Sequence, residues 1–114
     1  MAGKTSKNKG KRGEREAAKE LARLFGCEAR RGVQYAGGGD SPDVSHSIEG
    51  VHIEVKRAET LRLYSALDQA IEDAGELIPV VLHRRNLEPW VAITRLDDLP
   101  ALAVQLYLTL SEHK

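Results

Sequence analysis

Residues 43–57 read DVSHSIEGVHIEVKR, and this stretch decides the expected fold. From Val51 to Val55 apolar and polar side chains alternate, which is the two-residue period of a β-strand with one apolar face. Glu49-Gly50 separates this strand from a shorter one over residues 43–48 and suits a tight turn. The stretch therefore predicts two antiparallel strands joined as a hairpin.

Two segments with helical periodicity lie before and after these strands. Residues 14–25 and about 60–76 each repeat apolar side chains every three or four positions, so we expect a helix over each segment. The apolar positions are Ala17, Ala18, Leu21, Leu24 and Phe25 in the first helix and Leu63, Leu67, Ala70 and Ile71 in the second. Glu14 lies one turn before the first of them and should point inwards, whereas Glu16 should point to solvent.

Three more segments are expected to complete one sheet. Residues 27–35 suit an edge strand, 79–84 form a nearly continuous apolar run typical of a central strand, and 90–94 make a fifth strand. A last helix should follow, capped at residues 97–98 and ending near Leu110. The order of helix, three strands, helix, two strands and helix indicates an α/β fold with a five-stranded sheet flanked by helices.

The last helix is apolar on more than one side. Its expected core face is joined by further apolar residues that a small domain does not cover. These residues are Ala101, Val104 and Leu108. We therefore expect the chain to form a homodimer through this helix.

The net charge of zero conceals two regions of opposite sign. The first 35 residues contain ten basic and four acidic side chains, whereas the remainder contains seven basic and thirteen acidic ones. Residues 1–12 lack apolar periodicity and are expected to form a flexible basic arm ahead of one domain over 13–114. Such an arm suits contacts with the phosphates of a nucleic acid, and a solubilising tail is the alternative. The DNA-contacting candidates are Lys4, Lys7, Lys9, Lys11, Arg12, Arg15, Arg30 and Arg31.

Several protein classes have no support in the sequence. No apolar run follows the basic N-terminus, so neither a signal peptide nor a membrane span is expected. Cys27 is the single cysteine, which excludes an internal disulfide, and we interpret it as a small buried apolar residue. His46, His52 and His83 match no zinc-ligand spacing and are interpreted as ordinary strand residues. The chain is therefore expected to be a cytoplasmic protein.

Three side chains point to metal-dependent chemistry. Glu54 and Lys56 lie two positions apart on one face of their strand, and Asp43 begins the strand expected to pair with it. Carboxylates in such an arrangement hold Mg²⁺, which activates water and stabilises charge on a phosphate, while the lysine orients the nucleophile or neutralises that charge. Glu14, on the inward face of the first helix, is expected to supply a third carboxylate. A structural salt bridge among these residues is the alternative.

The same residues resemble a known nuclease motif. Ser41-Pro42-Asp43 followed by Ile53-Glu54-Val55-Lys56 resembles the PD-(D/E)xK signature. Residues 9–16, KGKRGERE, resemble the first helix of archaeal-type Holliday junction resolvases and their phage relatives. The resemblance extends from Lys9 to the last helix. It departs from that family at Gly37–Gly39, where the archaeal enzymes commonly have a serine.

The resemblance implies a nuclease domain with a mixed five-stranded sheet, and a homodimeric endonuclease of DNA recombination and repair that cuts two opposed strands of a four-way DNA junction. It implies that Glu14, Asp43 and Glu54 bind Mg²⁺, for which Mn²⁺ can substitute, and that Lys56 is the catalytic lysine. Gln69 matches a glutamine that many nucleases of this superfamily place near the lysine, on the following helix. An ordinary surface glutamine is the alternative.

Two other functions stay open on the sequence alone. A general endonuclease of the same superfamily would act on flaps, nicks or duplex DNA. A DNA-binding module would keep the basic residues without catalysis. The intact set of Asp43, Glu54 and Lys56 favours the two enzymatic functions over the binding module.

Overall fold

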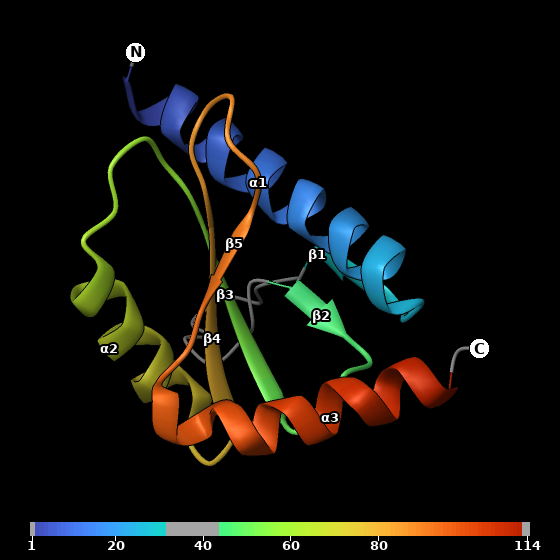
Figure 1. Cartoon of the computed structure of the whole chain (residues 1–114). Coiled ribbons are helices and arrows are strands. Elements are labelled where there is room, and N and C mark those ends of the chain that lie inside the picture. The colour runs from blue at the N-terminus through green and yellow to red at the C-terminus, as the bar shows by residue number, and fades with distance from the viewer. Residues whose placement is uncertain (1, 32–43, 113–114) are drawn as a thin grey trace.

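The computed structural model describes the backbone of residues 2–31 and 44–112, and the side chains in these ranges outside 2–10 and 31. The chain is an α/β fold, as the sequence predicted, and Figure 1 shows α1 and α2 on opposite sides of the strands with α3 across one end. The elements are α1 (Ala2–Phe25), β1 (Ala29–Arg31), β2 (Val44–His46), β3 (Val51–Arg57), α2 (Leu63–Ala74), β4 (Ile78–Arg84), β5 (Val91–Ile93), the 3₁₀ helix η1 (Leu96–Asp98) and α3 (Leu99–Glu112).

Within the described residues the strands form two sheets, which corrects the expected five-stranded sheet. β3, β4 and β5 form one sheet with β4 in the middle, where β3 is parallel and β5 antiparallel to it. β1 and β2 form a separate antiparallel pair. The larger sheet is mixed because α2 returns the chain from the end of β3 to the start of its parallel neighbour.

The predicted hairpin between β2 and β3 is wrong in the described part of the chain. β2 pairs with β1 instead, and β3 pairs with β4. A turn does form at Glu49-Gly50, where Gly50 has a φ of 76°. The Gly50 carbonyl accepts a hydrogen bond of 2.8 Å from the backbone N–H of Ile78, which begins β4. The turn therefore aligns β3 with β4, a long-range partner that residue alternation does not encode.

The first helix is longer than predicted. α1 begins at Ala2, so residues 2–12 are helical where we expected a flexible arm. Lysine and arginine have good helix propensity, and adding a turn to an existing helix costs less than starting one. Ala17 and Leu21 are buried as expected, whereas Leu24 is 54% exposed.

α1 approaches β3 closely at Gly13. A Cβ atom on this residue would lie 2.4 Å from the Cβ atom of Arg57, at the end of β3. Glycine inside a helix costs about 1 kcal/mol relative to alanine, and here it permits contact that no side chain would allow. The glycine thus sets how near the helix lies to the strand.

Two apolar clusters lie on the two faces of the larger sheet. The first joins α1 to β3 and includes Ala17, Ile53 and Leu102 of α3. The second joins α2 to β4 and includes Leu67 and Val81. β3 is covered on both faces, because all its residues from Val51 to Val55 are buried.

The second helix starts later than predicted. α2 begins at Leu63 and not near Thr60. Before it, the carboxylate of Glu59 accepts a hydrogen bond of 2.6 Å from the backbone N–H of Asn86, which holds this part of the chain against the β4–β5 loop. Leu63, expected to point inwards, is 41% exposed. The helix ends at Ala74 and is followed by Gly75 with a φ of 60°.

The last helix keeps one side against the core and exposes much of the rest. Leu102 is buried in the first cluster, and the side chain of Asp98, expected as a cap, instead accepts a hydrogen bond of 2.7 Å from Arg95 Nε. The exposed apolar residues of α3 are Leu99, Val104, Tyr107, Leu108 and Leu110. None of the described helices is long and apolar enough to span a membrane.

Candidate metal centre

The polar face of β3 is buried beneath α2. Strand register places Glu54 beside Val81, which belongs to the α2 cluster, so Glu54 faces α2 and Ile53 faces α1. His52 and Glu54 are only 5% and 4% exposed. A buried carboxylate costs free energy unless neighbouring groups compensate its charge. The surroundings of Glu54 therefore decide its role.

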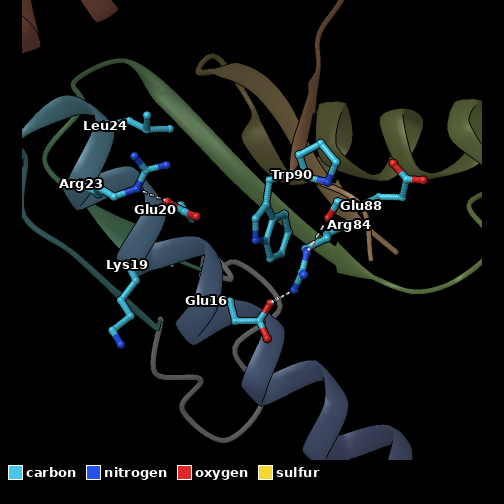
Figure 2. Close-up of a pocket in the computed structure, with 9 residues that line it drawn as sticks. Glu16, Lys19, Glu20, Arg23, Leu24, Arg84, Glu88 and Trp90 are labelled. Carbon is cyan, nitrogen blue, oxygen red and sulfur yellow. Dashed lines mark hydrogen bonds and ion pairs between the residues drawn. The ribbon is translucent and has the colours of Figure 1, made fainter. Parts of the chain in front are cut away.

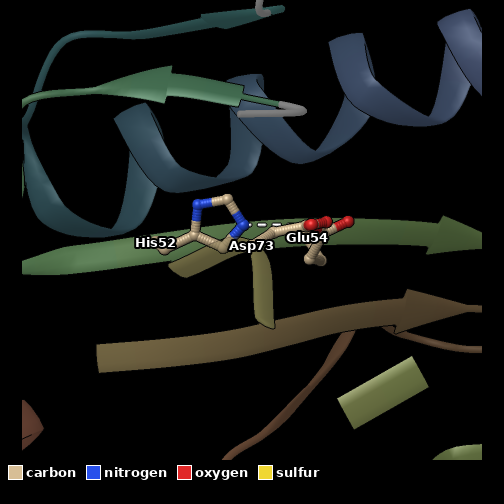
Figure 3. A group of neighbouring side chains, drawn as sticks. All are labelled: His52, Glu54 and Asp73. Carbon is tan, nitrogen blue, oxygen red and sulfur yellow. Dashed lines mark hydrogen bonds and ion pairs between the residues drawn. The ribbon is translucent and has the colours of Figure 1, made fainter. Parts of the chain in front are cut away.

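Two side chains from β3 and α2 lie close to the Glu54 carboxylate. Nε2 of His52 lies 2.9 Å from Oε1 of Glu54. Asp73 of α2 joins them, and one ligand atom from each of the three residues lies within 4.8 Å of the others. Figure 3 shows the His52 ring directed at the Glu54 carboxylate, with Asp73 beside them. Among the described residues, these three form the group whose ligand atoms lie close enough together to hold one cation.

His46 of β2 borders this group as a neutral ring. Its Nδ1 accepts a hydrogen bond of 3.0 Å from the backbone N–H of Ile48, so that nitrogen has no proton. Burial lowers the pKa of His46, a hydrogen bond with the Val51 backbone acts in the opposite direction, and the nearby His52 ring lowers the pKa further. His46 therefore adds no positive charge to balance the two carboxylates.

A hollow of ≈ 320 Å³ opens beside the group. Val44, His46, His52, Asp73 and Leu77 are among the residues that line it. Asp73 is only half-buried, so this hollow gives water and small ions access to Asp73 at the edge of the group. Glu54 is not among the described residues that line the hollow.

Lys56 lies two residues beyond Glu54 on the same face of β3. Its Nζ donates a hydrogen bond of 3.1 Å to Oε1 of Gln69 on α2. Gln69 lies one helical turn before Asp73, so α2 brings both residues to the polar face of β3. The structure therefore places Gln69 at the lysine, and its catalytic role stays a prediction.

Asp43, another expected ligand, lies outside the described residues, so its distance from Glu54 stays a prediction. Glu14 is half-buried on α1, which packs on the Ile53 face of β3, and it is not among the three residues of this group. Its role as a ligand also stays a prediction.

The expected DNA-contacting residues are exposed where their side chains are described. These are Lys11, Arg12, Arg15 and Arg30. Lys4, Lys7 and Lys9 lie in α1 and Arg31 in β1, and their side chains fall outside the described set.

The opposite face of the sheet has a separate polar network. Oε1 of Glu16 lies 2.9 Å from Arg84 Nη1 and 3.6 Å from Arg57 Nε, so the expectation that Glu16 is solvated is wrong. Figure 2 shows Glu16 and Arg84 in a hollow that Trp90 and the α1 side chains Lys19 and Arg23 also line. Its charges are paired across elements, which indicates that this network joins α1 to the sheet.

His52 and Asp73 were not among the site residues predicted from the sequence. His52 shares the two-residue period of Glu54 and Lys56, so strand alternation alone could have included it. Asp73 could not be found in this way, because its position depends on how α2 crosses β3. Cys27 is buried, as expected, and burial raises the pKa of its thiol. Hydrogen bonds with its own backbone and with Ser47 oppose part of this rise in pKa.

No protein-family model, curated protein or solved structure matches the chain. The buried group on β3 and α2, with Lys56 beside it, is the candidate functional site.

Proposed function

We propose that this chain is a divalent-metal-dependent DNA endonuclease that resolves four-way junctions. The observation that supports the proposal most is the polar face of β3, where a buried carboxylate, Glu54, lies two residues from a lysine that Gln69 holds. His52 and Glu54 are polar and nearly fully buried, and burying such side chains reduces the stability of a small core. Such an arrangement is expected where chemistry requires it.

The residues of this face suit phosphodiester hydrolysis. A divalent cation at the carboxylates lowers the pKa of a bound water molecule and neutralises charge on a phosphate. Glu54 supplies a ligand oxygen. The ammonium group of Lys56, held through Gln69, orients the attacking water or donates a hydrogen bond to a phosphate oxygen.

Asp43 is the second carboxylate of the proposal. Val44, the residue that follows it, lines the hollow beside His52 and Asp73. Its place in the motif supports Asp43 as a ligand.

Exposed basic residues on α1 and β1 suit a DNA partner. Lys11, Arg12 and Arg15 lie on α1 and Arg30 on β1. If they neutralise phosphates, replacing Arg12 and Arg15 by glutamine reduces the slope of log K against log salt concentration by about 2 for duplex arms. An unchanged slope would remove these two residues from the DNA interface.

A second copy of the chain is proposed as the partner of α3. Its exposed side chains include Val104, Tyr107 and Leu108, a larger apolar surface than one small domain needs. Two identical centres held at a fixed separation can cut two opposed strands of a junction. Sedimentation equilibrium of wild type and Tyr107→Glu checks this, with a monomeric wild type as the contrary result.

The decisive experiment is a cleavage assay on synthetic four-way junction, flap, nicked duplex, duplex and single strand, each with Mg²⁺ or Mn²⁺. Asp43→Asn, Glu54→Gln and Lys56→Gln are each expected to reduce cleavage by about 10³-fold. Junction binding, measured by gel shift, should change little. Lys19→Gln is the matched control, because Lys19 is an exposed lysine on α1 away from the polar face.

Each outcome identifies a different function. Paired cuts in opposed junction strands support a resolvase, and cuts confined to flaps, nicks or duplex support a general endonuclease. Binding without cleavage in either metal indicates a DNA-binding module and overturns the proposal. Full activity of Lys56→Gln would overturn the catalytic assignment of the lysine.

A further inference from the structure

We propose that His52, Glu54 and Asp73 form one divalent cation site that binds a transition-metal ion such as Mn²⁺ more tightly than Mg²⁺. The catalytic use of the ion rests on the proposed function, but its binding can be measured without DNA. The inference adds two ligands that the nuclease motif does not contain, and it reverses the metal preference expected from that motif.

The distances within the group fit a single ion. Adjacent ligands that lie about 2.1 Å from an octahedral ion are about 3 Å apart. The Nε2 atom of His52 and the Oε1 atom of Glu54 are 2.9 Å apart. The ligand atoms of all three residues lie within 4.8 Å of one another, so a small movement of Asp73 completes the site.

The burial of the three residues differs in a way that suits binding. His52 and Glu54 are nearly inaccessible, so packing holds their side chains in place before an ion arrives. Asp73 is half-buried and lines the hollow through which an ion can enter. Three protein ligands leave further coordination positions for water or a phosphate oxygen.

Two of the three side chains are carboxylates, Glu54 and Asp73. A divalent cation bound between them would be attracted by both.

The donor set favours a transition metal. Mg²⁺ prefers oxygen ligands in strict octahedral geometry and keeps several water molecules. An imidazole nitrogen suits first-row transition ions better, and their affinities for a mixed nitrogen and oxygen site exceed that of Mg²⁺. His52 is therefore the residue that sets the metal preference.

A structural explanation of the same geometry makes a different prediction. If the pair of His52 and Glu54 has only a structural role, it does not require a bound ion. In that case Mn²⁺ would bind weakly, at scattered surface carboxylates, and no single variant would change the affinity much. Measured affinity and stoichiometry therefore separate the two explanations.

The test is Mn²⁺ binding to the full chain without DNA, followed by the loss of the free-ion signal in electron paramagnetic resonance and by calorimetry. One ion per chain is expected, with Mg²⁺ at least tenfold weaker. Asp73→Asn should weaken Mn²⁺ binding by tenfold or more. Asp68→Asn removes the same charge from an exposed position of α2 and should leave the affinity unchanged.

A second variant keeps the test valid if Asp73→Asn alters the fold. His52→Gln retains a hydrogen-bond donor for Glu54 but removes the imidazole nitrogen. Pulsed resonance of bound Mn²⁺ should show coupling to a directly bound nitrogen in wild type, and His52→Gln should abolish it. Circular dichroism on each variant confirms that the fold is kept.

The results overturn the two proposals separately. Equal Mn²⁺ affinity in wild type and Asp73→Asn, equal losses in Asp73→Asn and Asp68→Asn, or Mg²⁺ binding as tight as Mn²⁺ would overturn the metal site. A chain that binds one Mn²⁺ as described but cleaves none of the DNA substrates would overturn the proposed function and leave this inference standing.

Discussion

The two faces of β3 are equally buried and chemically opposite. On one face Ile53 is 2% exposed and packs in the apolar cluster with α1. On the other, Glu54 is 4% exposed and lies with His52 close to Asp73 of α2. Burying the first side chain stabilises the fold, whereas burying the second opposes it. The contrast teaches that one strand can separate the residues that hold the fold from those proposed to act.

Replacing Ile53 by alanine tests the apolar face and should have the largest effect on stability. The cavity and the lost burial together are expected to reduce the free energy of unfolding by about 3 kcal/mol. Urea denaturation followed by circular dichroism measures this. Leu96→Ala is the control, because Leu96 is 81% exposed and its loss should cost little. A loss below about 1 kcal/mol at Ile53 would contradict tight packing against α1.

Gly13→Ala tests how closely α1 must approach the same face. The new methyl group would meet the Cβ atom of Arg57 at 2.4 Å, so helix and strand must separate. We expect a net loss of about 2 kcal/mol, because overpacking outweighs the better helix propensity of alanine. Thermal and urea unfolding provide the measurement. A stabilised variant would show that the helix adjusts without strain.

Gln69→Ala tests the polar face and should leave stability nearly unchanged. Without its partner the amine of Lys56 loses a fixed position, so we expect cleavage to fall about tenfold, or about 1.4 kcal/mol in activation free energy. Gln69→Glu keeps an acceptor oxygen and should recover part of the rate. If the alanine variant unfolds more easily and cleaves at the normal rate, Gln69 has a structural role only.

Glu16→Gln tests the network on the α1 side and should have the smallest effect. The ion pairs with Arg84 and Arg57 are partly exposed, so their loss is expected to cost about 0.5 to 1 kcal/mol. The difference in the free energy of unfolding from wild type should shrink in about 1 M salt, because salt screens such ion pairs. Unfolding measured at about 0.1 M and about 1 M NaCl checks this. Glu20→Gln is the control, since its partner Arg23 is 67% exposed. Equal costs for both variants would rule out a special role for Glu16.

Local patterns predicted the elements well where side-chain period and burial agree. The expected bounds of β3 match the structure, and the apolar run of residues 79–84 is the central strand β4. In each case the prediction depends only on residues close together in the sequence, which determine the side-chain period.

Strand partners and crossing helices could not be predicted in the same way. β3 pairs with β4 because α2 returns the chain to the same end of the sheet. The sequence also permits a hairpin between β2 and β3, so side-chain period alone does not choose between the two pairings. The prediction for Glu16 was wrong because its partners, Arg57 of β3 and Arg84 of β4, are distant from it in the sequence. Glu54 and Lys56 share a face by alternation alone, whereas Asp73 lies near Glu54 only through the packing of α2.

The parallel pairing of β3 and β4 has a consequence for how the molecule folds. The side chains of His52, Glu54 and Asp73, and Gln69 with Lys56, all fall within residues 52–73, inside one strand–helix–strand unit. Contacts at short sequence separation close small loops, which form faster than the distant contacts of α1. These five side chains can therefore come together before α1 docks on the opposite face of β3.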